Sequence, residues 1–147
     1  MEKRIAIDRN APSGQDRVSY DVLAVLLENE YSYLSSEMFR ACRLVVDTGI
    51  HAFGWTRERA IRYLVDNAGM TEPFAVAEID RYYVIPVQAL AYKLGELKIK
   101  ALHARAEREL GDRFDIRRFH NAVIDDGALP LSVLEERIDE WIAANRK

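Results

Sequence analysis

The spacing of the apolar residues constrains the fold of this chain more than any other feature of its sequence. Between Pro86 and Gly111 the apolar residues recur every three or four positions, which is typical of an α-helix packed along its whole length. A second row, Ile99, Leu102 and Ala106, widens that face. No stretch keeps the period of two that a half-buried strand requires. The sequence therefore predicts an all-α fold, a helical bundle. The main row consists of Val87, Leu90, Leu94, Leu97, Ala101 and Ala104.

Capping residues, glycines and prolines predict where about six to seven helices begin and end. Ser35 or Ser36 can cap a helix N-terminus, and so can Thr56 and Asp115. Pro73 suits a first helical turn, where its missing N–H costs little. The expected helices cover residues 16–34, 36–52, 56–69, 71–84, 86–110 and 115–127, and a seventh follows Pro130 and Ser132 and runs to about residue 144.

Composition and charge exclude several classes of protein. With 147 residues, 49% of them hydrophobic, the chain fits one globular domain, so we expect a flexible segment at residues 1–15 and a single all-α domain at residues 16–147. A net charge of −3 and the lack of a basic stripe argue against nucleic acid as a partner. No apolar run approaches the roughly 20 residues that span a bilayer. Because the charged start leads into no apolar stretch and Cys42 is the single cysteine, we expect a cytoplasmic protein with one buried thiol.

A first polar group lies on one face of the second expected helix. Arg43, Asp47 and His51 are spaced four residues apart, so Asp47 can pair with Arg43 and can also orient the imidazole of His51. A carboxylate–histidine pair of this kind occurs in acid–base and metal sites. The same spacing fits a solvated row of salt bridges equally well, and both interpretations stay open.

Two further polar groups follow along the chain. Glu78, Arg81 and Tyr82 are helical neighbours, and Tyr82 can present a hydroxyl donor to an oxyanion or fill the core instead. Gln88 and Tyr92 share a helix face, which is either a ligand-binding face or a surface polar pair. Nearby Gly95 costs a helix roughly 1 kcal/mol relative to alanine. We therefore expect another backbone or a ligand to approach it closely.

Six segments of the sequence follow one another in the order known from one bacterial family. They are Arg40–His51, Gly54–Ala60, Glu78–Tyr82, Pro86–Gly95, Phe114–His120 and Gly127–Leu131. On these segments the chain resembles the C-terminal part of the domain-of-unknown-function 885 family (DUF885), over about residues 30–144. One departure is Val87, where the family usually has glycine after the proline.

The resemblance implies the fold and chemistry of helical, gluzincin-type zinc metallopeptidases. The zinc motifs of that family are a His-Glu-x-x-Pro-Gly-His helix and a Glu-Gly-Trp-Ala-Leu-Tyr segment. Both lie N-terminal to the matching region, and neither occurs in this chain. By resemblance, Tyr82 donates to the tetrahedral intermediate with Arg81 beside it, and His51 is a further catalytic candidate. Gln88 and Tyr92 then bind substrate together with Arg81. The supporting residues are Asp47, Arg43 and Glu78.

We therefore expect the substrate-side C-terminal lobe of a zinc metallopeptidase-like protein, inactive without the zinc-binding half. Such a chain is either a truncated gene product or a short protein with another use. The alternative is a non-enzymatic helical module for oligomerisation or partner binding. We expect no cofactor in this chain and zinc only in complete family members, which would also take the peptide substrate. Its expected partner is a second copy or the missing N-terminal half, with no nucleic acid and no membrane.

Overall fold

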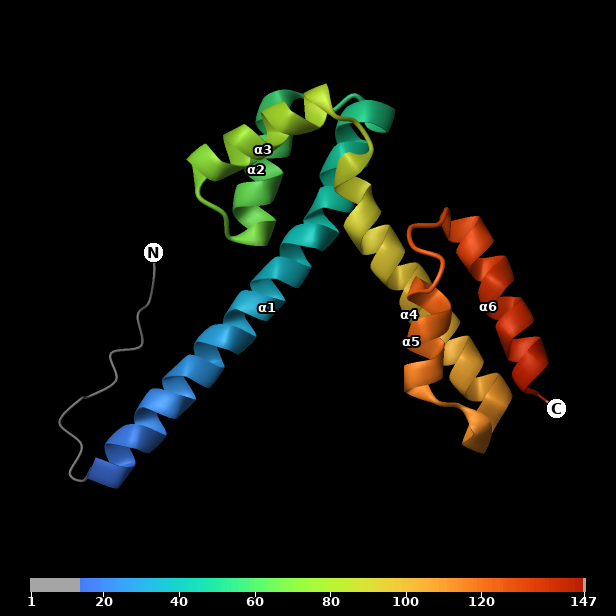
Figure 1. Cartoon of the computed structure of the whole chain (residues 1–147). Helices are drawn as coiled ribbons and strands as arrows, with labels where there is room; N and C mark the ends of the chain where they lie inside the picture. Colours follow the sequence, from blue (N-terminus) through green and yellow to red (C-terminus); the bar gives the residue numbers. More distant parts are fainter. Residues whose placement is uncertain (1–13, 147) are drawn as a thin grey trace. The chain divides into compact units, whose positions relative to one another are not determined.

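The structure of the chain, a computed structural model, describes residues 14–146, with side chains from residue 21 onward (Figure 1). These residues form six α-helices and two short 3-10 helices, and none of them lies in a strand, which confirms the predicted all-α fold. Residues 1–13, most of the segment predicted to be flexible, lie outside the described residues. The elements are α1 Gly14–Phe53, α2 Arg57–Ala68, α3 Glu72–Val84, η1 Gln88–Leu90, α4 Ala91–Leu110, η2 Gly111–Arg113, α5 Ile116–Ile124 and α6 Leu131–Asn145.

The helices group into two compact units. The first extends to Pro86 and holds α1, α2 and α3, whereas the second begins at Val87 and holds α4, α5 and α6. Each is described by itself below. A single domain over residues 16–147 stays a prediction, because the compactness of each unit does not say whether the two unfold together.

The first helix, α1, is continuous over 40 residues, and the predicted break at Ser35 or Ser36 is wrong. An N-cap residue must leave the helical conformation, and nothing near these serines forces the backbone to do so. Neither glycine nor proline occurs between residues 15 and 48. Serine inside a helix costs only a few tenths of a kcal/mol, roughly, so the helix continues through both residues.

Other helix ends lie where the sequence predicts them. The Thr56 hydroxyl oxygen accepts a hydrogen bond from the Arg59 N–H at 3.2 Å at the start of α2. The Asp115 carboxylate accepts one from the Arg117 N–H at 2.8 Å at the start of α5. Pro73 lies in the first turn of α3. Side-chain caps thus satisfy N–H groups that have no partner within the helix.

The helix predicted from Pro86 begins later, because the chain turns at Val87. Val87 has a φ of 73°, a left-handed conformation that is strained for a β-branched residue. The 3-10 helix η1 follows, and regular α-helix starts only at Ala91. Glycine, the residue that the family usually has at this position, adopts a positive φ without that strain.

The core of the first unit draws on all three of its helices. Helix α2 packs against both α1 and α3, beside the C-terminal half of α1, while the N-terminal half of α1 extends past them (Figure 1). Cys42 is 4% exposed, which confirms its predicted burial, and burial raises the pKa of its thiol. The buried apolar residues are Cys42, Val46, Ile50, Ala60, Ile61, Leu64, Ala68, Ala75, Ile79 and Tyr82.

The core of the second unit corrects the predicted packing of α4. Helix α6 packs along α4 and against α5. The buried residues of α4 come from the second apolar row, Leu102 and Ala106, together with Leu110. Leu94 and Leu97 of the main row are 45% and 50% exposed, so the prediction that α4 packs along its whole length is wrong. A helix buries only the stripe that its neighbours cover. The core residues are Leu102, Ala106, Leu110, Phe119, Ala122, Leu134, Ile138 and Ile142.

Two helical glycines have opposite surroundings. A Cβ atom added to Gly95 would meet no atom of the described residues within 4 Å, so the predicted close approach of another backbone is wrong there, whereas that of a ligand stays a prediction. A Cβ added to Gly49 would lie 2.5 Å from Cδ2 of Trp55. The backbone N–H of Trp55 also donates to the Gly49 carbonyl at 2.9 Å. The indole therefore occupies the space that a side chain at residue 49 would need.

These surroundings predict opposite effects of the same substitution. Gly95→Ala should raise the free energy of unfolding by about 1 kcal/mol, because alanine restricts the unfolded chain and meets open space. Gly49→Ala should lower it by about 1–3 kcal/mol, because the indole must move. Urea denaturation followed by circular dichroism measures both values. Equal effects in the two variants would contradict this account of the glycines.

Candidate functional site

The residues predicted as a site fall into two groups. Six of them lie in the first unit, three on α1 and three on α3, and the structure brings the two helices together there. Gln88 in η1 and Tyr92 in α4 belong to the second unit, where Tyr92 is 53% exposed. A substrate cleft shared by both groups stays a prediction. The first group is Arg43, Asp47, His51, Glu78, Arg81 and Tyr82.

Glu78 is the centre of the hydrogen bonding on α3. The Tyr82 hydroxyl donates to Oε2 of Glu78 at 2.9 Å. Arg81 donates from Nη2 to the same oxygen at 2.7 Å and from Nε to Oε1 at 3.1 Å. The spacing of three and four residues puts all three side chains on one helix face, as the sequence predicts. The Tyr82 side chain itself lies in the core, only 1% exposed.

This network sets the protonation of both acidic groups. Burial by itself raises the pKa of Glu78, but the hydrogen bonds from Arg81 and Tyr82 outweigh it and hold the pKa below its usual range. Burial, followed by the hydrogen bond to Glu78, raises the pKa of Tyr82 far above its usual value. Near neutral pH the pair is thus a carboxylate and a neutral phenol. The phenol can donate a hydrogen bond, and it does so to Glu78.

Arg43 joins α1 to this network. Its guanidinium carbon lies 5.6 Å from the ring centroid of Tyr82 and 5.5 Å from that of Phe39, within cation–π range. Its charge also helps to lower the pKa of Glu78. Arg43 and Asp47, one turn apart, are 7% and 1% exposed. A solvated row of salt bridges, one interpretation of this face, is therefore wrong for both residues.

His51 connects the end of α1 to the end of α3. Its Nε2 lies 3.1 Å from the carbonyl oxygen of Tyr82. Because a carbonyl only accepts hydrogen bonds, Nε2 carries the proton in this contact. The Tyr82 carbonyl is among the last four of α3, which have no partner within the helix. The imidazole thus caps α3 while its ring stays exposed.

The described residues do not fit a zinc ion. Among residues 21–146, no three side chains of histidine, cysteine, aspartate or glutamate come together where a metal could bind. His51 uses its Nε2 for the Tyr82 carbonyl. His103 and His120, in the second unit, pack with ring centroids 5.3 Å and 6.2 Å from that of Phe119. No step of a reaction can be derived through zinc from these residues.

One ion pair near the Glu78 network could not be predicted from the sequence. Arg57 of α2 donates from Nε and Nη2 to the two carboxylate oxygens of Asp80 on α3, at 2.6 Å and 2.9 Å. This bidentate pair joins helices whose residues are 23 positions apart in the chain. Helical spacing finds partners within one helix only, so the pairing could not be inferred before the fold was known.

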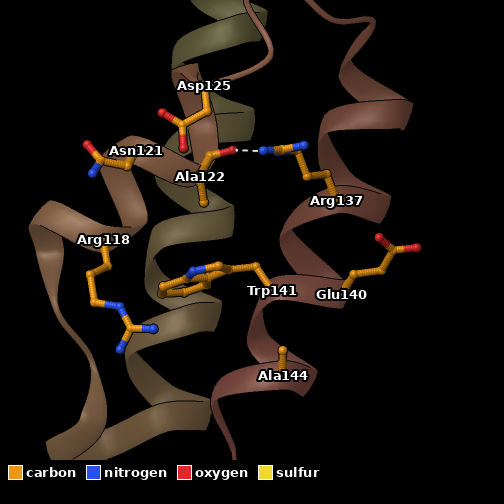
Figure 2. A pocket seen from close by; sticks show the side chains of 8 residues that line it. All are labelled: Arg118, Asn121, Ala122, Asp125, Arg137, Glu140, Trp141 and Ala144. Carbon is orange, nitrogen blue, oxygen red and sulfur yellow. Dashed lines mark hydrogen bonds between the residues drawn. The ribbon is translucent and has the colours of Figure 1, made fainter.

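A second candidate site is an open hollow of about 480 Å³ between α5 and α6 (Figure 2). The Trp141 side chain projects into the hollow from α6. Arg118 of α5 and Arg137 of α6 also line it. Arg118 donates to the Asn145 side-chain oxygen at 2.5 Å, and Arg137 donates to the Ala122 carbonyl at 2.9 Å. Both guanidinium groups are thus already engaged within the protein. The lining residues are Arg118, Asn121, Ala122, Asp125, Arg137, Glu140, Trp141 and Ala144.

Length and hydropathy decide whether a helix can span a membrane. No helix within residues 14–146 is both long enough and apolar enough to cross a bilayer. Even α1, the longest, carries Asp16, Asp21, Glu28 and Glu30 in its N-terminal half.

Comparison with known proteins supports the family resemblance. The family model described as "Bacterial protein of unknown function (DUF885)" matches residues 20–138. No curated protein matches the chain.

A solved structure extends this finding. "The crystal structure of the putative lipoprotein from Colwellia psychrerythraea" matches with a TM-score of 0.76 and 48% sequence identity, over 78% of this chain and 20% of that one. The chain thus spans about a fifth of the length of the Colwellia protein. Since that protein is described as a lipoprotein, the cytoplasmic location of this chain stays a prediction.

The lowered pKa of Glu78 predicts a loss of stability in acid. A carboxylate whose pKa is lower in the folded than in the unfolded chain stabilises the fold above its unfolded pKa of about 4.3. That contribution is lost as the pH falls through the folded value. Glu78→Gln should therefore cost about 1–3 kcal/mol at pH 7, and the difference from wild type should shrink below about pH 4. Thermal unfolding across this pH range measures it.

A matched control is Asp66→Asn on the exposed surface of α2. In the Asp66→Asn variant the melting temperature should fall with decreasing pH as it does in wild type. A Glu78→Gln variant that loses stability in acid as steeply as wild type would show that another carboxylate is responsible.

Proposed function

The chain belongs to the bacterial DUF885 family, and on that premise we propose that it is a substrate-side lobe of a larger, zinc metallopeptidase-like protein. In this proposal the zinc is held by a part of the protein outside this chain. The chain contributes a helical surface against which that part packs, and by itself it does not cleave peptides.

One observation carries the proposal: the fold of this chain recurs as a fifth of a longer protein. The Colwellia protein shares 48% sequence identity with it over 78% of its residues. Identity at that level indicates that these residues perform a related task in both proteins. The engagement of His51 Nε2 by the Tyr82 carbonyl supports zinc ligands that lie outside this chain. A gluzincin-type reaction needs a metal and a general base.

The proposed role of Tyr82 requires an exchange of hydrogen bonds. Its hydroxyl donates to Glu78 and its side chain is buried. To stabilise the oxyanion of a tetrahedral intermediate, the hydroxyl would have to leave Glu78 and reach the substrate oxygen. Arg81, which also binds Glu78, would keep the carboxylate paired during that exchange. The neutral state of the phenol, with its raised pKa, suits a donor that keeps its proton.

We predict that the isolated chain neither binds zinc tightly nor hydrolyses peptides. Two residues with suitable spacing, Asp47 and His51, supply at most two of the three protein ligands that a catalytic zinc needs. Isothermal titration with zinc and a peptidase assay check this, with the full-length Colwellia protein assayed in parallel. Submicromolar, stoichiometric binding that His51→Ala abolishes would contradict the prediction. A full-length protein without zinc-dependent cleavage would contradict the proposed peptidase.

A second prediction concerns Tyr82 in a complete relative. Tyr→Phe at the position matching Tyr82 should lower kcat about 100-fold or more with little change in KM, because the donor acts on charge that develops in the transition state. Steady-state kinetics with a peptide substrate measure both constants. Tyr→Phe at the position of Tyr33, which is 58% exposed on α1 and outside the predicted site, is the control. An unchanged kcat would remove Tyr82 from the site.

A further inference from the structure

Helix α1 carries a second apolar face in addition to the one that packs in the core. Cys42, Val46 and Ile50 are buried on the first face. A separate line of apolar residues, which we name the α1 seam, lies roughly 100° round the helix from them, at 100° per residue. Its spacings are 3, 4, 3, 4, 3 and 4, the pattern of a coiled-coil seam. The α1 seam consists of Ala24, Leu27, Tyr31, Leu34, Met38, Ala41 and Val45.

The large residues of the α1 seam are exposed to solvent. Leu27 is 59% exposed, Tyr31 73%, Leu34 56%, Met38 51% and Val45 41%. Single exposed apolar residues are normal on a protein surface, but a contiguous line of them marks an interaction site. Helix α1 also extends past α2 and α3, so its N-terminal half lacks cover from them (Figure 1). A helix in water is marginal without packing of its apolar face.

The charges beside the α1 seam indicate what covers it. Between Asp21 and Met38 the chain has four acidic residues and no lysine, arginine or histidine. Two of the four, Glu28 and Glu30, occupy positions that flank the seam, where a coiled coil pairs its charges with those of the partner helix. A second copy would bring two acidic segments together, and such like-charge pairs are unfavourable.

We propose that the α1 seam is a docking site for an amphipathic helix whose apolar stripe is flanked by lysine and arginine. The apolar stripe would bury the large seam residues, and the basic flanks would pair with the glutamates. Residues 21–38 are about 27 Å of helix at 1.5 Å per residue, enough for a partner of two to three heptads. This docking does not depend on whether proteins of the family cleave peptides.

Two synthetic peptides of about three heptads test the proposal on the whole chain. Both carry leucine at the a and d positions, and one has lysine and the other glutamate at e and g. Fluorescence anisotropy should show the lysine peptide binding at least about tenfold more tightly, a difference of about 1.4 kcal/mol. Because charge sets this preference, the ratio of the two affinities should fall when the ionic strength rises from about 0.1 M to 1 M.

Variants on α1 assign the binding to the α1 seam. Leu27→Ser combined with Leu34→Ser should weaken binding of the lysine peptide at least about tenfold. The matched control is Val22→Ser with Leu26→Ser, which are 52% and 57% exposed on another side of the same helix. It should bind as wild type does. Glu28→Lys with Glu30→Lys should reverse the preference in favour of the glutamate peptide. Circular dichroism verifies that every variant keeps its helix content.

Three results would overturn the proposal. Equal affinity for the two peptides would show that charge does not select the partner. Equal weakening by the seam and control variants would show that the peptides bind elsewhere. A dimer in sedimentation that dissociates in the seam variant and not in the control would show that a second copy is the occupant. None of these measurements involves peptide cleavage, so they stay separate from the test of the proposed function.

Discussion

The first unit depends on charged groups buried between α1 and α3. Arg43 and Asp47 enter the core from α1, and the Arg43 guanidinium lies against the ring of Tyr82 on α3. Isolated buried charges cost several kcal/mol each, so they persist only where partners are held in place. On α3 the Glu78 carboxylate has such partners, because it accepts hydrogen bonds from both Arg81 and the Tyr82 hydroxyl. The contact of Arg43 with the Tyr82 ring and the hydrogen bond of His51 to the Tyr82 carbonyl thus join α1 to α3.

The same contacts limit the chemistry of the candidate site. A tyrosine whose hydroxyl binds a carboxylate, and whose pKa is raised, is oriented and neutral. Those are properties of a hydrogen-bond donor and not of a base. His51 is similarly committed, since its Nε2 proton caps the Tyr82 carbonyl. The first unit therefore offers an oriented hydrogen-bond donor, the Tyr82 hydroxyl, while the described residues do not fit a zinc ion.

Both units show apolar surface that their own helices do not cover. On α1 it is the α1 seam, and on α4 it is the main apolar row, where Leu94 and Leu97 are about half exposed. In each case the helix has two apolar stripes, of which only one is buried. Contiguous exposed apolar residues of this kind mark interaction surfaces.

The sequence by itself determined the all-α class, most helix ends and the grouping of Glu78, Arg81 and Tyr82, because helical period and capping act within a few residues. It did not determine which of two apolar rows on α4 is buried, since periodicity finds a stripe but not the neighbour that covers it. Nor could it locate the Arg57–Asp80 pair, which spans two helices. The break predicted at Ser35 hid the α1 seam, whose period is visible only along a continuous helix. Burial of Arg43 and Asp47 and the contact of the Arg43 guanidinium with the Tyr82 ring were decided by tertiary packing, because desolvation and cross-helix contacts exist only in the folded chain.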